Sequence, residues 1–495
     1  MALPGRWWWW RVERQFLGSL LQGPAATGGA KVASIPLRAA MAPAPRPLPS
    51  TGALSGVGEA LAFFRNGDFA RQRFERYGNV FETRLLGQRL VFIRGGAAIG
   101  ELLAQPEASE GWWPASVRQL LGSRSLANRN GVEHRARRRA VGQLFSAAAL
   151  RRYTPGIVSL VEGLAAQLAA DPGPLPLVEQ LRRFAFTVIA EVVLGLEASE
   201  REALFADFEI WTRALFSLPL ALPASPFARA LQARQRLLLR LGRVLEQARR
   251  RAAAGLPLSG GLDLLSGAMD GAGLPLADDD LVEQLLLLLF AGYETTASSL
   301  SCLMAALLQH HDVLSWLEQE LETLPWPPPA GEAATAYDGS AAPRLTAVVQ
   351  EVMRLNPPVG GFFRRTTREL VLDGVRVPAG RVVQVALAAS NRYRPEGTAA
   401  DDLERFRPAR HLGAGCGLTL LPYGGGERVC LGRPLAELEI RLLAVGLLKL
   451  VRLRLVPEQD LSLQLVPSPS PRSGLLVRSV GLADQGPEPI GTLPP

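Results

Sequence analysis

A single cysteine, Cys430, lies near the end of a glycine-rich segment with the sequence LPYGGGERVCLG, residues 421–432. A strongly helical segment follows directly, and the free amides and positive end of that helix favour a thiolate. One thiolate, with no second cysteine or histidine in the segment, cannot hold a zinc ion. It can serve as the single axial ligand of a haem iron. The alternative interpretation is a structural cysteine buried beside a glycine turn.

The same segment has the spacing aromatic-x-x-Gly-x-Arg-x-Cys-x-Gly, with Tyr423, Gly426, Arg428, Cys430 and Gly432 at the restricted positions. In this it resembles the cytochrome P-450 family, the haem-thiolate monooxygenases. Tyr423 departs from the family pattern, which usually has Phe at that position. The resemblance implies haem b (iron protoporphyrin IX) as the cofactor, Cys430 as the iron ligand and Gly432 as part of the cofactor-binding loop.

A second motif, residues 291–296 with the sequence AGYETT, lies inside a long apolar segment that is expected to be helical. Thr295 follows Ala291 by four residues, so its hydroxyl can bond to the Ala291 carbonyl, and Gly292 leaves room for a bulge. The family resemblance implies that this helix crosses over the haem and that Glu294 and Thr295 deliver protons to oxygen. The alternative is a Ser/Thr patch that bonds only to the backbone.

The pair Glu351 and Arg354 has the spacing Glu-x-x-Arg, which places opposite charges on one face of a helix. This spacing alone is common and is weak evidence for a functional site. The sequence FRPAR at residues 406–410 strengthens the interpretation, because it resembles a further motif of the family. The resemblance implies a buried ion network of Glu351, Arg354 and Arg410 that locks the Cys430 loop.

The two carboxylates of a haem require cations. By their positions in the motifs, four residues resemble the family's contacts to the haem propionates: His134, Arg138, Arg364 and Arg428. The neighbouring Arg135, Arg137 and Arg139 would point elsewhere and form a docking patch for an acidic ferredoxin. The alternative for this charge run is a solvated helix face.

The segment that follows the Glu-x-x-Arg helix contains Pro-Pro-Val-Gly-Gly, and in this family it lines the pocket above the haem. Together with residues 216–219, FSLP, it resembles animal retinoic-acid hydroxylases and their cyanobacterial relatives. We therefore expect an apolar pocket for a retinoid- or isoprenoid-like substrate. Steroids, other terpenes and fatty acids are the alternatives. The expected pocket residues are Trp113, Ala291, Val359, Gly360, Gly361 and Phe362.

Composition narrows the class of protein. The chain has 495 residues, 48% of them hydrophobic, so it can bury a large core. Its three cysteines exclude a disulfide framework and suit a reducing compartment, and its four histidines argue against a multi-histidine metal site. The net charge of +8 comes almost entirely from scattered arginines, which argues against nucleic-acid binding.

The periodicity of apolar residues predicts a mainly α protein with small β-sheets, the triangular, α-rich, single-domain cytochrome P-450 fold. Two hairpins are expected, 80–86 with 89–93 and 370–372 with 375–377, and two further strands, 461–465 and 475–480, flank a Pro- and Ser-rich turn. The expected helices are Leu102–Leu121, Gly131–Phe145, Pro155–Ala170, Gln180–Leu194, Ala228–Ala253, Leu281–Gln309, Leu345–Leu355 and Pro434–Leu453.

The expected domain covers residues 45–485, with a flexible tail at 486–495. Charged residues interrupt the apolar stretches of residues 1–44, which we interpret as a disordered leader or a mis-assigned start, with Met41 as the true start. Leu281 to His310 is apolar enough to suggest a membrane span, but Glu294 would be costly in lipid, so a buried core helix is expected.

These features predict a soluble, monomeric monooxygenase of a bacterial cytoplasm, cyanobacterial by its resemblance. It would insert one atom of O2 into a C–H bond of an apolar substrate. No flavin or iron–sulfur segment is visible, so electrons from NADPH or a photosystem would arrive through ferredoxin and ferredoxin reductase. The alternatives are a peroxide-using haem-thiolate hydroxylase or isomerase, and a non-enzymatic haem-binding protein.

Overall fold

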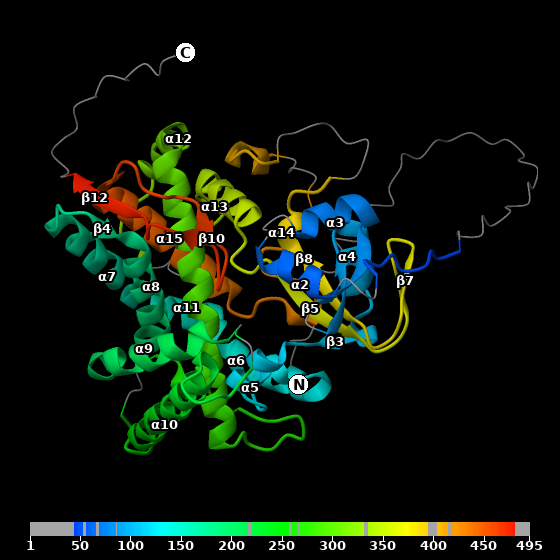
Figure 1. Ribbon diagram of the computed structural model, residues 1–495. Helices are drawn as coiled ribbons and strands as arrows, with labels where there is room; N and C mark the ends of the chain where they lie inside the picture. The colour runs from blue at the N-terminus through cyan, green and yellow to red at the C-terminus, as the bar shows by residue number, and fades with distance from the viewer. Residues whose placement is uncertain are drawn as a thin grey trace, which may run out of the picture. The chain divides into compact units, whose positions relative to one another are not determined.

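The computed structural model describes residues 44–480, apart from short gaps at 53–55, 66–68, 86, 216, 218, 257–259, 266–267, 331–334, 395–402, 414–417 and 419. The expected tail at 486–495 and the expected leader, except Ala44, lie outside the described residues, as do two positions of the segment 216–219. Within the described part the chain is mostly helical with small sheets (Figure 1), so the predicted fold class is confirmed.

Helices occur along the whole described part of the chain, with strands between some of them. Their bounds are α2 Gly56–Arg65, α3 Phe69–Tyr77, α4 Gly96–Leu103, α5 Ala115–Leu121, α6 Gly131–Gly142, α7 Ala147–Ala170, α8 Leu177–Thr187, α9 Ala198–Arg213, α10 Pro226–Ala253, α11 Asp278–Gln309, α12 His311–Leu321, α13 Pro343–Leu355, α14 Leu387–Ser390 and α15 Arg433–Leu450. A π-helical segment, η5, covers Val188–Val193 and continues α8.

A five-stranded sheet has the order β1-β2-β8-β5-β3. Its strands are β1 Val80–Leu85, β2 Gln88–Ile93, β8 Val382–Ala386, β5 Gly361–Thr366 and β3 Ser109–Gly111. Within this sheet β2 and β8 pair in parallel, and the other described pairs are antiparallel. The smaller sheets contain β6 Leu370–Leu372 with β7 Val375–Val377, β4 Leu175–Pro176 with β12 Leu476–Val480 and β9 Arg452–Leu455, and β10 Leu463–Gln464 with β11 Ser470–Pro471.

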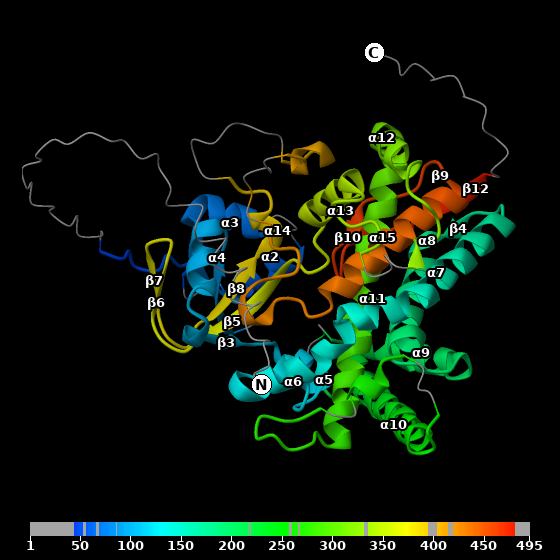
Figure 2. The ribbon, with the colours of Figure 1, turned by 180° about the vertical axis from the view of Figure 1, so that it is seen from behind.

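Helix α11 runs through the helical part, and Figures 1 and 2 show α7, α8 and α9 on the side of it away from the five-stranded sheet. It begins with three acidic residues, Asp278, Asp279 and Asp280, which suit the positive end of a helix. By length and composition α11 could cross a membrane, but 72% of its most apolar window is buried inside the protein. It is therefore a core helix, as predicted.

Helix starts follow ordinary capping chemistry. Ser146 accepts a hydrogen bond from Ala149 N at the start of α7, and Ser225 accepts one from Ala228 N at the start of α10. The Ser146 cap extends α7 upstream of the predicted start at Pro155, which lies inside the helix.

The predicted helix Leu102–Leu121 is wrong. It is divided into the end of α4, strand β3 and helix α5, because Pro106, Gly111 and Pro114 interrupt the helical pattern. The predicted hairpins around residues 87 and 373 are confirmed by β1–β2 and β6–β7. The two predicted carboxyl-terminal strands do not pair with each other. Strand β12 pairs with β9 and β4, whereas β10 pairs with β11.

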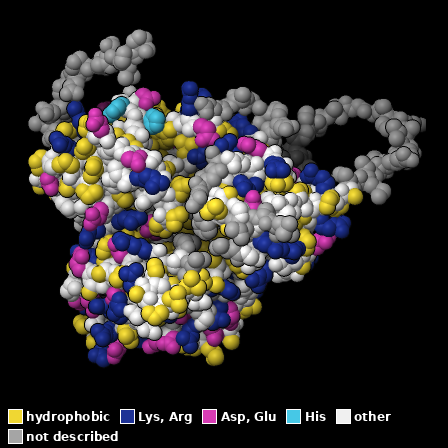
Figure 3. Space-filling model, viewed as in Figure 1, with side chains coloured by type: hydrophobic (Ala, Val, Ile, Leu, Met, Phe, Trp, Pro, Cys, Tyr) yellow, Lys and Arg dark blue, Asp and Glu magenta, His cyan; other side chains and the backbone are white. Residues whose placement is uncertain are grey.

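On the face seen in Figure 3, cationic and anionic side chains are interspersed. This agrees with the scattered arginines of the sequence. Many of these arginines form exposed ion pairs one helical turn apart, such as Arg71 with Glu75 and Arg250 with Glu246. Such pairs contribute little to stability.

Candidate active site

Backbone hydrogen bonds fold the segment 421–432 back on itself. Gly424 N donates to Leu421 O at 2.9 Å, and Cys430 N donates to Tyr423 O at 2.9 Å. Gly424 has φ 71°, a conformation that side-chain-bearing residues rarely adopt. The segment thus holds Cys430 two residues before Gly432, the residue that precedes the first turn of α15.

The Cys430 side chain is exposed to solvent, yet surrounding protein desolvates its thiol enough to raise the pKa. Both observations fit a thiol that faces a recess. The backbone N–H groups of Gly432 and Arg433 and the charge of Arg138 act in the opposite direction and favour the thiolate. The expected effect of the helix start is therefore present but is outweighed by desolvation. A thiolate here is retained best when a metal cation binds the sulfur.

Solvent also reaches the middle of α11. Ala291 is exposed, whereas most of the helix around it is buried. Thr295, one turn later, donates through Oγ1 to Ala291 O at 2.7 Å, as its spacing predicts. The hydroxyl proton is thereby directed to the backbone and the oxygen is left able to accept.

The predicted bulge at Gly292 is wrong, because α11 is a continuous α-helix at this point. A Cβ atom on Gly292 would lie 2.4 Å from Ile189 Cδ1. Glycine is therefore required for the close packing of α11 on the π-helical segment η5, and the irregular backbone lies in the partner segment.

The Glu294 carboxylate is buried on another side of α11, where Arg182 of α8 donates to it at 3.1 Å. Burial raises the pKa of Glu294, the charge of Arg182 lowers it, and the nearby Glu209 raises it further. Glu294 and Thr295 are adjacent in sequence, but the structure directs Glu294 to Arg182 and Thr295 to Ala291. Sequence reasoning missed Arg182, which lies far away in the chain in an amphipathic helix with no distinguishing pattern.

Cationic side chains gather next to the Cys430 loop. Arg138 donates to Val429 O at 2.7 Å, Arg364 lies 3.5 Å from Gly425 O, and Arg428 donates to Arg129 O.

His134 is buried beside these arginines. Burial, together with the charges of Arg428, Arg138 and Arg364, lowers the pKa of His134 to about 4. Burial and the charge of Arg428 lower the pKa of Arg364 to about 10.

No ion pair joins any of these four residues to a carboxylate in the described part of the chain. The three arginines are desolvated, Arg428 repels both Arg364 and Arg138, and the neutral His134 can still donate an N–H group, so the cluster fits a site for anionic groups. The donor set, one thiolate candidate beside unpaired cations, therefore fits a haem and its two carboxylates.

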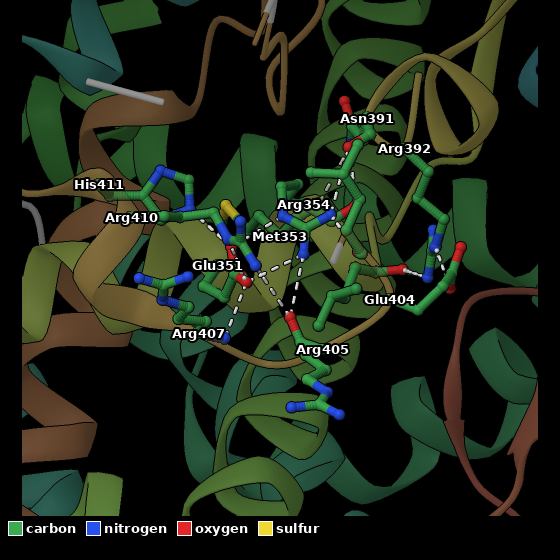
Figure 4. A network of polar contacts seen from close by, with 12 residues as sticks. Glu351, Met353, Arg354, Asn391, Arg392, Glu404, Arg405, Arg407, Arg410 and His411 are labelled. Atoms are coloured by element: carbon green, nitrogen blue, oxygen red, sulfur yellow. Dashed lines mark hydrogen bonds and ion pairs between the residues drawn. The ribbon is translucent and has the colours of Figure 1, made fainter. Parts of the chain in front are cut away.

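Glu351 is the centre of a buried network (Figure 4). Arg354 donates to both of its oxygens, at 2.8 and 2.9 Å, and Arg410 Nε donates to Oε1 at 2.9 Å. His411 Nε2 lies 2.7 Å from Oε2, and Arg407 N donates to Oε1 at 2.9 Å. Burial alone would raise the pKa of Glu351, but the hydrogen bonds from Arg354, His411 and the Arg407 amide hold it far below its usual value.

The structure thus brings the three predicted members of this network together and adds His411. Its position directly after Arg410 was the only sequence signal for it. Arg354 also donates to Leu403 O at 2.8 Å and to Asn391 O at 3.3 Å, so the network joins α13 to the segments around it.

The prediction of a docking patch on α6 is wrong for Arg137. Arg137 is 4% exposed and forms ion pairs with Glu133 and with Asp280 of α11, so it is not available to a partner. Arg135 and Arg139 are exposed. The side chain of Arg137 is apolar along most of its length, which suits burial once the guanidinium is paired.

The expected pocket residues differ in their surroundings. Val359 is 44% exposed and Gly360 is exposed. A Cβ atom on Gly361 would lie 2.3 Å from Val385 O, so this glycine serves the pairing of β5 with β8 and does not widen the pocket. Phe362 lies against Gly424 of the cysteine loop, and the guanidinium of Arg364 lies over its ring at 4.6 Å.

Trp113 is half-buried and packs against the main hydrophobic core. The structure therefore brings Phe362 and Arg364 to the cysteine loop, whereas Trp113 and Phe362 pack against two different hydrophobic clusters.

Comparisons with known proteins agree with this geometry. The family model described as Cytochrome P450 matches residues 43–478. The chain is 35% identical over 441 residues to the Putative cytochrome P450 120 of Synechocystis, covering 87% of this chain and 96% of the relative. It is 32% identical over 436 residues to Cytochrome P450 26B1 of Mus musculus, covering 86% of this chain and 85% of the relative.

A solved structure, "Retinoic acid bound cyanobacterial CYP120A1", matches with a TM-score of 0.79 at 34% identity, covering 89% of this chain and 100% of that chain. Members of the matched family carry haem and use O2, apolar substrates and redox partner proteins. With a family model that covers most of its length and relatives above 30% identity, the chain belongs to the cytochrome P450 family and is a haem-thiolate monooxygenase.

Proposed function

We propose that this monooxygenase inserts one oxygen atom from O2 into a C–H bond of a retinoid-like, isoprenoid substrate. The observation that carries the proposal is the combination of the Cys430 loop with desolvated arginines that form no ion pair in the described part of the chain. The substrate class is supported by the solved structure of a relative at 34% identity, cyanobacterial CYP120A1, which has retinoic acid bound.

Cys430 would hold haem b through its sulfur, with Gly432 and Arg433 donating backbone N–H groups to that sulfur. When bound, the haem supplies the reductive activation of O2, and a thiolate ligand favours O–O cleavage. His134, Arg138, Arg364 and Arg428 would receive its two carboxylates. Bringing anions among the three arginines relieves their mutual repulsion, which is the physical gain from binding.

Thr295 and Glu294 would control protons on the substrate side. Because Thr295 Oγ1 donates to Ala291 O, its oxygen can accept a hydrogen bond from water. Burial raises the pKa of Glu294, so its protonated form is more favoured than in an exposed carboxyl group. It would release Arg182 and turn toward Thr295 when it delivers that proton.

The Glu351–Arg354–Arg410 network would act structurally. A bidentate arginine fixes direction as well as charge, and the backbone contacts of Arg354 tie α13 to the segments that precede the cysteine loop. Its function would be to keep Cys430 in place during turnover.

The substrate pocket would be formed by Ala291, Val359, Gly360 and Phe362, with Trp113 as a further wall. Steroids, other terpenes and fatty acids are competing substrate classes. We take residues 45–485 as the catalytic domain of a cytoplasmic, monomeric enzyme. Electrons would come from NADPH or a photosystem through ferredoxin reductase and an acidic ferredoxin that docks near the exposed Arg135 and Arg139.

The direct experiment is turnover of the holoenzyme with ferredoxin, ferredoxin reductase and NADPH, using retinoic acid, a steroid and a fatty acid as substrates. The proposal expects oxygenated retinoic acid that contains one atom from labelled O2. Oxygenation of only another class contradicts the substrate assignment. Product formed with peroxide alone favours the peroxide-using alternative, and absence of product from every class favours a non-enzymatic haem-binding protein.

A further inference from the structure

Tyr293, the residue before Glu294, is 1% exposed and its ring is enclosed by aromatic side chains. Phe208 lies edge-on at 5.1 Å between ring centroids, with Phe186 at 6.1 Å and Phe205 at 6.0 Å. These contacts fix the direction of the Tyr293 hydroxyl.

The fixed hydroxyl donates to Oε1 of Glu209 on α9 at 3.1 Å. The other oxygen of Glu209 accepts from Arg213 at 2.7 Å, and the Glu209 side chain is 27% exposed. Glu209 is therefore a partly solvated carboxylate whose position is set from inside the protein by Tyr293 and from outside by Arg213.

The Glu209 carboxylate acts on the buried ion pair of Arg182 and Glu294. The charge of Arg182 favours the ionised form of Glu294, whereas the negative charge of Glu209 disfavours it. Arg182 and Glu209 also act on the Tyr293 hydroxyl, in opposite directions. Helices α8, α9 and α11 thus contribute two polar contacts here, Arg182 with Glu294 and Tyr293 with Glu209.

We propose that Glu209 is a positioning residue for Glu294: its negative charge, fixed by Tyr293, weakens the hold of Arg182 on Glu294 and keeps Glu294 able to carry a proton. The inference rests on the proposed function, in which Glu294 delivers protons. Without Glu209, the charge of Arg182 would act on Glu294 with less opposition, so the ionised form of Glu294 would be more favoured than in the unchanged protein.

The groups that face Glu294 in the described part of the chain come from three helices. They are Arg182 from α8, Glu209 with its partner Arg213 from α9, and Tyr293 from α11 itself. Segment η5 packs on α11 at Gly292 through the apolar Ile189, and the carboxylate of η5, Glu191, is paired with Arg201.

The test compares Glu209→Gln and Tyr293→Phe with the unchanged protein, all as ferric holoenzyme. Infrared difference spectra recorded across pH follow the protonated carboxyl of Glu294, whose band is identified by its loss in Glu294→Gln. Removing the charge of Glu209 should move the midpoint of this band to lower pH by about one unit. Tyr293→Phe keeps the Glu209 carboxylate but removes the hydrogen bond that fixes its position, so a smaller shift in the same direction is expected.

Glu202→Gln is the matched control. Glu202 lies on the same helix and pairs with Arg183, the neighbour of Arg182, but does not act on Glu294. Its substitution should leave the midpoint unchanged. Equal shifts in Glu202→Gln and Glu209→Gln would reflect general surface charge and would overturn the inference.

The pH profile of product formed per NADPH gives an independent readout. In Glu209→Gln the decline of coupling at alkaline pH should begin about one unit lower, because Glu294 loses its proton earlier. If Glu294→Gln uncouples the enzyme while Glu209→Gln changes neither readout, only this inference fails. If Glu294→Gln is fully coupled, the proposed role of Glu294 fails with it.

Discussion

Arg137 of α6 and Asp280 of α11 form an ion pair in which Arg137 Nε donates to Asp280 Oδ1 at 3.0 Å. Their side chains are 4% and 9% exposed. The pair joins the helix that carries His134 and Arg138 to the start of the central helix that carries Thr295. Two parts of the site that are distant in sequence are thereby held by one buried contact.

Removing either partner should be strongly destabilising. Asp280→Asn would leave the Arg137 guanidinium desolvated and incompletely paired, which we expect to lower the free energy of unfolding by about 3–5 kcal/mol. Urea unfolding of the holoenzyme measures this, with Arg135→Met as a control on the exposed face of the same helix. Equal, small effects of the two substitutions would contradict the structural role of the pair.

Glu351 should stabilise the fold in a pH-dependent way. Its pKa is lowered in the folded state, so its contribution is fully present above about pH 4.5 and is lost as the pH falls toward the folded value. Glu351→Gln should cost about 3–5 kcal/mol at neutral pH, and its stability should fall less steeply below about pH 4.5.

Urea unfolding at a series of pH values tests this expectation for Glu351. Glu75→Gln, which removes an exposed carboxylate paired with Arg71, is the control and should change little. Parallel pH curves for Glu351→Gln and the unchanged protein would show that the carboxylate is not held ionised.

Much of the fold was readable from sequence because local signals were strong. The turn Asp373-Gly374 specified the β6–β7 hairpin, and the apolar run before Ala291 specified the core helix. The helix predicted across Leu102–Leu121 failed because Pro106, Gly111 and Pro114 interrupt it, and strand β3 within it pairs with β5, more than 250 residues later.

The site was predictable where a motif carried it and not where tertiary packing did. The spacing of Thr295 and Ala291 gave a hydrogen bond that the structure contains. By contrast, glycine is required at position 292 because Ile189 of segment η5 packs closely against it, and the partner of Glu294 lies in α8. Such contacts leave no local pattern in the chain.

The Thr295 hydroxyl should determine how efficiently reducing equivalents reach product. Thr295→Val keeps the shape of the side chain but removes the group that bonds to Ala291 O, so product per NADPH should fall about tenfold or more while peroxide rises. Thr295→Ser retains the hydroxyl and should recover most of the coupling. A valine variant that is as well coupled as the unchanged enzyme would rule out this role.

Arg364 should help to retain the haem. Arg364→Leu removes one desolvated cation from the cluster beside the cysteine loop. A hydrogen bond to a charged group contributes about 1.5–3 kcal/mol, so haem release should be about 10- to 150-fold faster. Transfer of haem to an excess of an acceptor globin measures the rate. The control is Arg365→Leu on the same strand, because the Arg365 side chain is 42% exposed. Equal release from both variants would contradict the assignment of Arg364.

The central claim is that the sulfur of Cys430 binds the haem iron, and the reduced carbon monoxide spectrum tests it most directly. The unchanged protein and Cys302→Ala, which alters the buried cysteine of α11, should both show the red-shifted Soret band of thiolate ligation. Cys430→Ala should lose that band even when haem is supplied in excess. Persistence of the red-shifted band in Cys430→Ala would contradict the account.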